Sequence, residues 1–148
     1  MSKEKAIIID IDGVILESYP ILEEIHKKKL TGDVMWDYFH SNCNNSRVKF
    51  MSNISLLLSC LNASVKVVLS TSRNEKCRQS TEERLKVENF NYTTLYMRKE
   101  KDERPSPEVK KEHIHEIRQK FDIIAFIDDD LSNCLMAEGE GILALRKV

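Results

Sequence analysis

Five short apolar runs alternate with helical patterns along the chain, and this alternation limits the fold more than any other feature. The runs cover residues 6–10, 65–70, 93–97, 123–127 and 142–145, and they are typical of buried strands. Strands that alternate with helices predict a doubly wound α/β fold, with a mainly parallel five-stranded sheet and right-handed crossovers in a Rossmann-like arrangement. Ligands bind such sheets at the carboxyl ends of the strands, where the strand order reverses.

The segments between these runs carry the periodicity and the end signals of helices. Four helices follow from these signals: one over the amphipathic residues 48–61, one capped by Asn74 and ending near Val87, one capped by Ser106 with Pro107 at its first position and ending near Lys120, and one that begins at Ser132 or Asn133 and ends near Gly139. We expect a single domain over residues 1–148, in which residues 17–47 form at most a small helical insert or cap.

Composition narrows the class of protein. The chain has 148 residues, of which 41% are hydrophobic and 32% charged, as in a soluble globular domain. The net charge of -1 gives no global basic field, so contact with nucleic acid would need a local basic patch. No apolar run approaches the ~18 residues of a membrane span, and no signal peptide opens the chain. The four cysteines are scattered, which favours reduced thiols in a cytoplasmic protein.

Chemically active side chains gather at the ends of the expected strands. Asp10 and Asp12 end the first strand, and Gly13 supplies the bend. Thr71-Ser72-Arg73 ends the second, and Asp128-Asp129-Asp130 ends the fourth. Lys110 lies in the first turn of the helix after the third strand. Each element alone has an ordinary explanation, such as an acidic loop or a surface lysine, but together they would meet at one edge of the sheet.

Carboxylates from two strand ends form an all-oxygen site, and such a site suits Mg²⁺, which takes its remaining ligands from water and phosphate. Thr71 and Lys110 would neutralise a phosphate group beside the metal. One aspartate could attack phosphorus to form an aspartyl-phosphate, and a second could protonate the leaving oxygen and later activate water. The residues therefore predict metal-assisted phosphoryl transfer through a covalent intermediate.

The chain resembles the haloacid dehalogenase-like (HAD) phosphatases in four short motifs. Asp10-Ile11-Asp12-Gly13-Val14 is similar to their first motif, and the strand that ends at Thr71 is similar to the second. Lys110 stands at the third, and Asp128-Asp129 at the acidic fourth. The motifs follow in the family's order and span nearly the whole chain, so the resemblance implies the HAD fold and a phosphoric monoester hydrolase.

A longer pattern resembles the 3′-phosphatase domain of phage polynucleotide kinase. The pattern comprises Thr71-Ser72-Arg73, Trp36-Asp37-x-Phe39, Met97-Arg98, Asp102, Arg104-Pro105 and Val109-Lys110. The resemblance implies that Asp10 is the nucleophile, that Asp12 is the general acid and base, and that Thr71 and Lys110 hold the phosphate. It implies that Asp10, Asp128 and the backbone carbonyl of Asp12 bind Mg²⁺, with Asp129 as a further candidate ligand. Arg73, Arg98 and Arg104 become candidates for substrate contacts, together with the backbone at Gly13.

Two departures from this family affect the substrate rather than the chemistry. Asp130 stands where the relatives often have an arginine. The helix that follows often carries a tryptophan in the relatives, whereas here it reads Ser132-Asn133-Cys134-Leu135-Met136. From the resemblance we expect the substrate to be a 3′-phosphorylated nucleic acid end. The alternatives are a mononucleotide, or a non-catalytic module that binds nucleic acid. A kinase partner would be a separate chain, because no phosphate-binding Gly-x-x-x-x-Gly-Lys-Ser/Thr loop is present. A separate ligase is the other candidate partner. His113 and His115 are not expected to share a metal ion, because residues two apart on a helix diverge.

Overall fold

Five parallel strands form one sheet in the order β5-β4-β1-β6-β7. The computed structural model describes all residues from Met1 to Val148. The strands are β1 (Glu4–Ile9), β4 (Val65–Asn74), β5 (Thr94–Arg98), β6 (Phe121–Asp128) and β7 (Ala144–Arg146). All five predicted strands are confirmed, and so is the parallel α/β architecture. The chain passes from β1 to one side of the sheet and then returns to the other side, so the strand order reverses beside β1.

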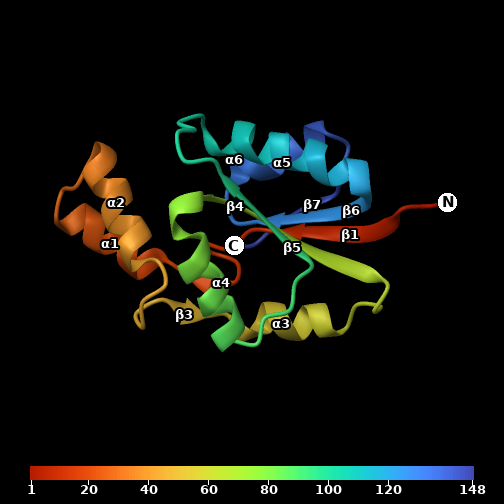
Figure 1. The fold of residues 1–148 in the computed structure, drawn as a ribbon, viewed down its shortest axis with the longest axis horizontal. Helices are drawn as coiled ribbons and strands as arrows, with labels where there is room; N and C mark the ends of the chain where they lie inside the picture. The colour runs from red at the N-terminus through yellow and green to blue at the C-terminus, as the bar shows by residue number, and fades with distance from the viewer.

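Helices cover both faces of this sheet (Figure 1). On one face lie α5 (Ser106–Lys120) and α6 (Leu131–Gly139); on the other lie α3 (Ser52–Ser59) and α4 (Arg78–Val87). Successive residues of β1 supply the two layers in turn, because side chains alternate along a strand. Ala6 and Ile8 join the core under α5 and α6, whereas Ile7 and Ile9 join the larger core on the opposite face.

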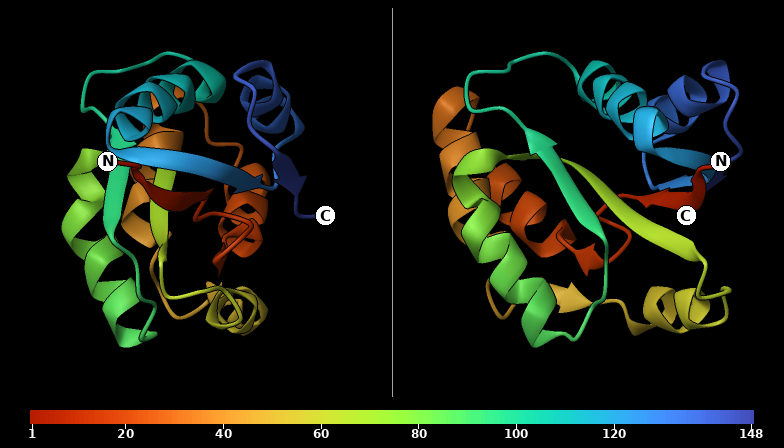
Figure 2. Two further views of the ribbon diagram at one scale, coloured as in Figure 1. Left: turned by 90° about the vertical axis from the view of Figure 1, so that its right-hand side faces the viewer. Right: turned by 45° about the vertical axis from the view of Figure 1, so that its right-hand side comes forward.

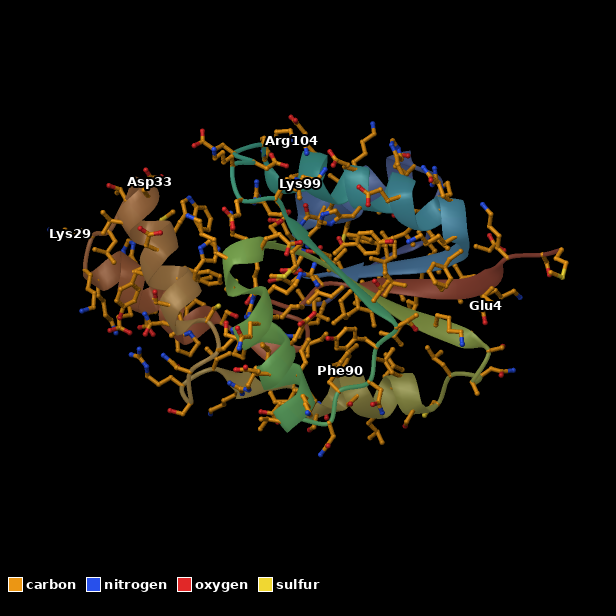
Figure 3. The ribbon with its side chains drawn as sticks, in the orientation of Figure 1. Glu4, Lys29, Asp33, Phe90, Lys99 and Arg104 are labelled. Carbon is orange, nitrogen blue, oxygen red and sulfur yellow. The ribbon has the colours of Figure 1, made fainter.

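Two further helices lie between β1 and β4. After β2 (Leu16–Glu17) come α1 (Tyr19–Lys27) and α2 (Gly32–Asn42), and the chain returns through β3 (Lys49–Phe50), which pairs antiparallel with β2. Figure 2 shows both helices beyond one end of the sheet. In Figure 3, Lys29 and Asp33 mark the far tip of this insert, at the opposite end of the molecule from Glu4. The insert therefore lies toward the carboxyl ends of the strands.

The prediction of an amphipathic helix over residues 48–61 is wrong for the first turn of that helix. Residues 49–50 are extended because Phe50 pairs with Leu16, and the amide of Met51 donates to the carbonyl of Ile15 at 2.8 Å. Only Ser52–Ser59 is α-helical. The apolar period continues across the boundary because Val48, just before the short strand, is buried in the same core as the helix residues Ile54 and Leu58.

Three other helix starts differ slightly from the prediction. Asn74 caps a short 3-10 helix, η1 (Glu75–Cys77), and α4 follows directly. Helix α5 begins at Ser106, one residue earlier than expected, with Pro105 at the N-cap. Helix α6 begins at Leu131 because Asp130 acts as its N-cap: the carboxylate of Asp130 accepts hydrogen bonds from the amides of Ser132 and Asn133. No helix of the structure is long and apolar enough to cross a membrane.

Candidate active site

Three carboxylates meet at the carboxyl ends of β1 and β6. Oxygen atoms of Asp10, Asp128 and Asp129 all lie within 4.8 Å of one another. Asp10 and Asp128 are buried, while Asp129 is exposed. The amide of Asp10 donates to the carbonyl of Ile127 at 2.9 Å, so pairing of the two strands brings the residues together. The predicted meeting of these strand ends is confirmed.

A tight loop follows Asp10 and presses against the acidic cluster. The carbonyl of Ile11 accepts from the amides of Val14, Ile15 and Leu16 at 2.8–3.2 Å, which folds the chain back on itself. Gly13 has a φ of +79°, and a Cβ at this position would lie 2.1 Å from Oδ2 of Asp129. Gly13 is therefore required by both its backbone conformation and its contact with Asp129.

Lys110 bridges the two buried carboxylates. Its Nζ lies 2.9 Å from Asp10 Oδ1 and 2.6 Å from Asp128 Oδ2, and its side chain is 2% exposed. Burial opposes the charge of Lys110, but the charges of Asp10 and Asp128 outweigh burial and raise the pKa of Lys110. The lysine reaches this position because α5 packs against β4 and β6, and its first residue, Ser106, is bonded to Ser72 at the end of β4.

One ammonium group does not balance this cluster. Burial raises the pKa of Asp10 to about 8; Lys110 opposes this rise, and the charges of Asp128 and Asp12 add to it. Burial and the charge of Asp128 also raise the pKa of Asp129. A site with three converging carboxylate oxygens and too little positive charge fits a hard divalent cation.

The carboxylate of Asp12 lies outside the cluster and is held by Arg73. Nε and Nη2 of Arg73 donate to its two oxygens at 2.9 and 2.8 Å, and the hydroxyl of Ser18 donates to Oδ1. Burial disfavours the charged form of Asp12, but Arg73 and Ser18 outweigh burial and lower the pKa of Asp12. Of the four residues predicted for the metal, Asp12 can therefore offer a cation its backbone carbonyl rather than its side chain.

Arg73 is enclosed by the protein rather than presented to a substrate. Its side chain has no exposed surface. Nη1 donates to Asn44 Oδ1 at 2.6 Å and to Thr81 Oγ1 at 3.1 Å, and Nη2 donates to the carbonyl of Cys43 at 3.1 Å. As placed, Arg73 orients Asp12 and joins it to the end of the insert.

The other two predicted substrate arginines hold the loop between β5 and α5. Arg98 donates to the backbone carbonyls of Ser72, Asp102 and Arg104 at 2.6–3.1 Å. Arg104 pairs with the carboxylates of Asp102 and Glu112, each at 2.6 Å. The sequence placed these cations near the site, but it did not show that nearby acceptors would engage them.

Thr71 lies buried at the end of β4, where its Oγ1 accepts from the amide of Arg73 at 3.1 Å. Beside it, the hydroxyls of Ser72 and Ser106 share a hydrogen bond of 2.6 Å, which ties β4 to the start of α5. The hydroxyl hydrogen of Thr71 remains free to donate to an anion at the strand end.

Sequence reasoning missed three residues that support the site: Ser18, Asn44 and Asn133. Nδ2 of Asn133 lies 3.2 Å from both carboxylate oxygens of Asp128, and its own Oδ1 is buried without a partner. Ser18 precedes α1 but donates to Asp12 instead of capping the helix. A polar residue near a helix start was the only signal for Ser18 and Asn133, and it predicts a cap rather than a contact with an aspartate.

The two histidines on α5 do not come together. His113 is buried, with Nδ1 2.8 Å from Ser70 Oγ and Nε2 3.2 Å from the carbonyl of Met97. His115 lies on the surface beside Glu140. The structure therefore places the two side chains in different surroundings.

Several solved structures share this fold at low sequence identity. A chain of the Pnkp1/Rnl/Hen1 RNA repair complex superposes with a TM-score of 0.77 and 22% identity over 98% of this chain and 42% of its own length. In a second structure of the Pnkp1/Rnl/Hen1 complex, the match covers 47% of the longer chain. The chain thus spans less than half the length of these relatives. A haloacid dehalogenase-like hydrolase from Streptococcus pneumoniae superposes with a TM-score of 0.70 and 14% identity over 95% of this chain and 83% of its own.

Family membership rests on a match of the sequence itself. No curated protein matches the sequence significantly. The profile of the HAD superfamily, subfamily IIIB (acid phosphatase), matches residues 1–145, which include the four motifs and the acidic cluster. The chain therefore belongs to subfamily IIIB (acid phosphatase) of the HAD superfamily.

Proposed function

We propose that this enzyme removes the 3′-phosphate from nucleic acid ends in a Mg²⁺-dependent reaction, with Asp10 as the nucleophile. The observation that carries the proposal is the arrangement of Asp10, which lies in a cluster of three carboxylates and is paired with Lys110. Asp12 stands apart on Arg73. Two aspartates in different surroundings can take two different roles.

In this proposal Asp10, Asp128 and Asp129 hold Mg²⁺ together with the backbone carbonyl of Asp12. The fit rests on the oxygen-only donor set and on the raised pKa of Asp10, which reflects burial and a shortage of positive charge in the cluster. When bound, the metal ion would neutralise charge on the phosphate and the nucleophile.

The chain's own residues would perform the two steps. In the first step, a carboxylate oxygen of Asp10 attacks phosphorus, the bond to the 3′-oxygen breaks, and Asp12 gives that oxygen a proton. Lys110 and the hydroxyl of Thr71 stabilise the transferred phosphoryl group. In the second step, Asp12 takes a proton from water, the resulting hydroxide attacks phosphorus, and inorganic phosphate leaves Asp10. The negative charge of the substrate beside Asp12 would favour the protonated form that the first step needs.

A 3′ nucleic acid end is supported by the longer motif pattern and by the likeness to a chain of an RNA repair complex. We include in the proposal that α1 and α2 act as a small cap on this domain, and that a kinase or a ligase is its partner. A mononucleotide is the second candidate substrate. The donors of Arg98 and Arg104 are largely engaged within the protein, so these arginines are not free to bind the backbone phosphates of a polynucleotide. This observation favours the mononucleotide.

The test measures phosphate release from a 3′-phosphorylated oligonucleotide and from a panel of mononucleotides, with Mg²⁺ and with a chelator. Asp10→Asn is compared with Asp33→Asn, a matched change at the tip of the insert (Figure 3). The proposal expects metal-dependent release from the oligonucleotide that is lost only in Asp10→Asn. Release from mononucleotides alone would transfer the function to the second candidate. Phosphate release that persists in Asp10→Asn would exclude Asp10 as the nucleophile.

A further inference from the structure

The strand order gives the active site two flanks. β5 and β7 are the edge strands, and both end at the same side of the sheet as Asp10. A nucleic acid chain bound by its terminal phosphate can leave the site past either of these flanks. Phosphate-backbone contacts depend on free cationic groups, so the charges available on each flank indicate the path.

The flank at β5 has more basic residues, but the ones nearest the strand end are engaged. Arg98 donates to backbone carbonyls, and Arg104 is paired with Asp102 and Glu112. Nζ of Lys99 lies 2.8 Å from Glu112. Figure 3 shows Lys99 and Arg104 close to each other on this loop. A phosphate here would have to compete with carboxylates already in place.

The flank at β7 carries Arg146 directly beside the acidic cluster. Arg146 is opposite Asp128 in the strand register, and its Nε donates to the backbone carbonyl of Asp129 at 3.0 Å. This bond fixes the base of the guanidinium group, while its two terminal nitrogens have no partner and no carboxylate forms an ion pair with it. The amide of Lys147 donates to the carbonyl of Asp128 at 2.9 Å, so a second cationic residue is tied to the same place.

Neither exposed aspartate on this flank, Asp129 or Asp130, forms an ion pair with Arg146. The carboxylate of Asp130 accepts from the amides of Ser132 and Asn133 at the start of α6. An exposed arginine anchored through Nε, with its terminal fork free, has the geometry that binds a phosphate through two parallel hydrogen bonds.

We infer that a polynucleotide leaves the active site across the carboxyl end of β7, where Arg146 binds an internucleotide phosphate next to the reacting end. This inference rests on the proposed 3′-phosphatase function. It makes Arg146 a residue that distinguishes a polymer from a mononucleotide, because only the polymer carries a second phosphate at that position.

The experiment compares kcat/KM for a 3′-phosphorylated oligonucleotide and for a 3′-mononucleotide in wild type, Arg146→Ala and Arg146→Lys. We expect Arg146→Ala to lower kcat/KM for the oligonucleotide about tenfold more than for the mononucleotide, as for loss of a charged hydrogen bond. For the oligonucleotide, the slope of log kcat/KM against log salt concentration should also become shallower by about one unit, which corresponds to the loss of one phosphate contact. Arg146→Lys should retain part of the preference.

Two control variants make the result specific. Arg118→Ala removes an exposed arginine that also donates to a backbone carbonyl, that of Glu140, but lies at the end of α5. Lys101→Ala removes an exposed lysine on the β5 flank. A selective loss in Lys101→Ala, or equal effects of Arg146→Ala on both substrates, overturns the path across β7. If the wild type prefers the oligonucleotide and Arg146→Ala has the same preference, this inference alone is overturned. If the wild type is inactive on the oligonucleotide, the 3′-end proposal is overturned as well.

Discussion

Gly13 allows a test of whether the acidic cluster is a working metal site, because a second glycine provides a matched control. Gly13 and Gly141 have φ values of +79° and +76°, so alanine at either position pays the cost of a left-handed backbone. That cost is about 1–2 kcal/mol of unfolding free energy. Only at Gly13 does the new Cβ collide with another group, at 2.1 Å from Oδ2 and 2.5 Å from Cγ of Asp129.

We therefore expect both variants to lose similar stability in urea unfolding, but only Gly13→Ala to lose function. The displaced Asp129 would leave Asp10 and Asp128 as the remaining carboxylates of the cluster. The Mg²⁺ concentration for half-maximal phosphate release should rise about tenfold or more, in line with the effect of disturbing the surroundings of a metal ligand. If Gly13→Ala and Gly141→Ala show the same metal requirement and the same turnover, the contact with Asp129 has no part in the reaction.

Three further changes probe the residues around the cluster. Arg73→Met leaves Asp12 without its cation and should lower the unfolding free energy by about 3 kcal/mol, with a fall in kcat; unchanged urea unfolding would contradict the pairing. Asn133→Ala removes the donor to both oxygens of Asp128 and should raise the Mg²⁺ requirement about tenfold, which a metal titration of phosphate release checks. Burial lowers the pKa of His113 from 6.5 to about 4, so the unfolded state binds the proton first as pH falls through this range. The wild type should therefore lose about 3 kcal/mol more stability between pH 7 and pH 4 than His113→Asn, and equal acid sensitivity of the two proteins would refute this.

The strands and their ends could be predicted because they depend on local sequence. Apolar runs of β-branched residues form the interior of a parallel sheet, and the ends of parallel strands necessarily meet. The convergence of Asp10, Asp128 and Lys110 followed from this rule. The boundary at residues 49–50 did not, because it depends on pairing with a strand more than thirty residues earlier in the chain.

The partners of the arginines could not be predicted for the same physical reason. Arg73 looked like a substrate contact because it follows a strand end, but its acceptors Cys43 and Asn44 come from the end of the insert. The position of Arg146 was equally hidden, since it depends on the register of β7 against β6. A charged residue at a strand end can thus be located from sequence, whereas its direction depends on contacts that only the tertiary structure reveals.

Arg73 also explains how one short motif can supply two different carboxyl groups. Asp10 and Asp12 are separated by a single residue, so on an extended chain their side chains would point the same way and add two charges to one cluster. The bidentate pair with Arg73 instead holds the Asp12 carboxylate apart from the Asp10 cluster. In the proposed reaction this separation is necessary, because a carboxylate that coordinates a cation cannot also carry a proton to the leaving oxygen. In the proposed reaction, the buried arginine thus keeps the Asp12 carboxylate out of the cation site, and its charge favours the ionised form of Asp12 that takes a proton from water in the second step.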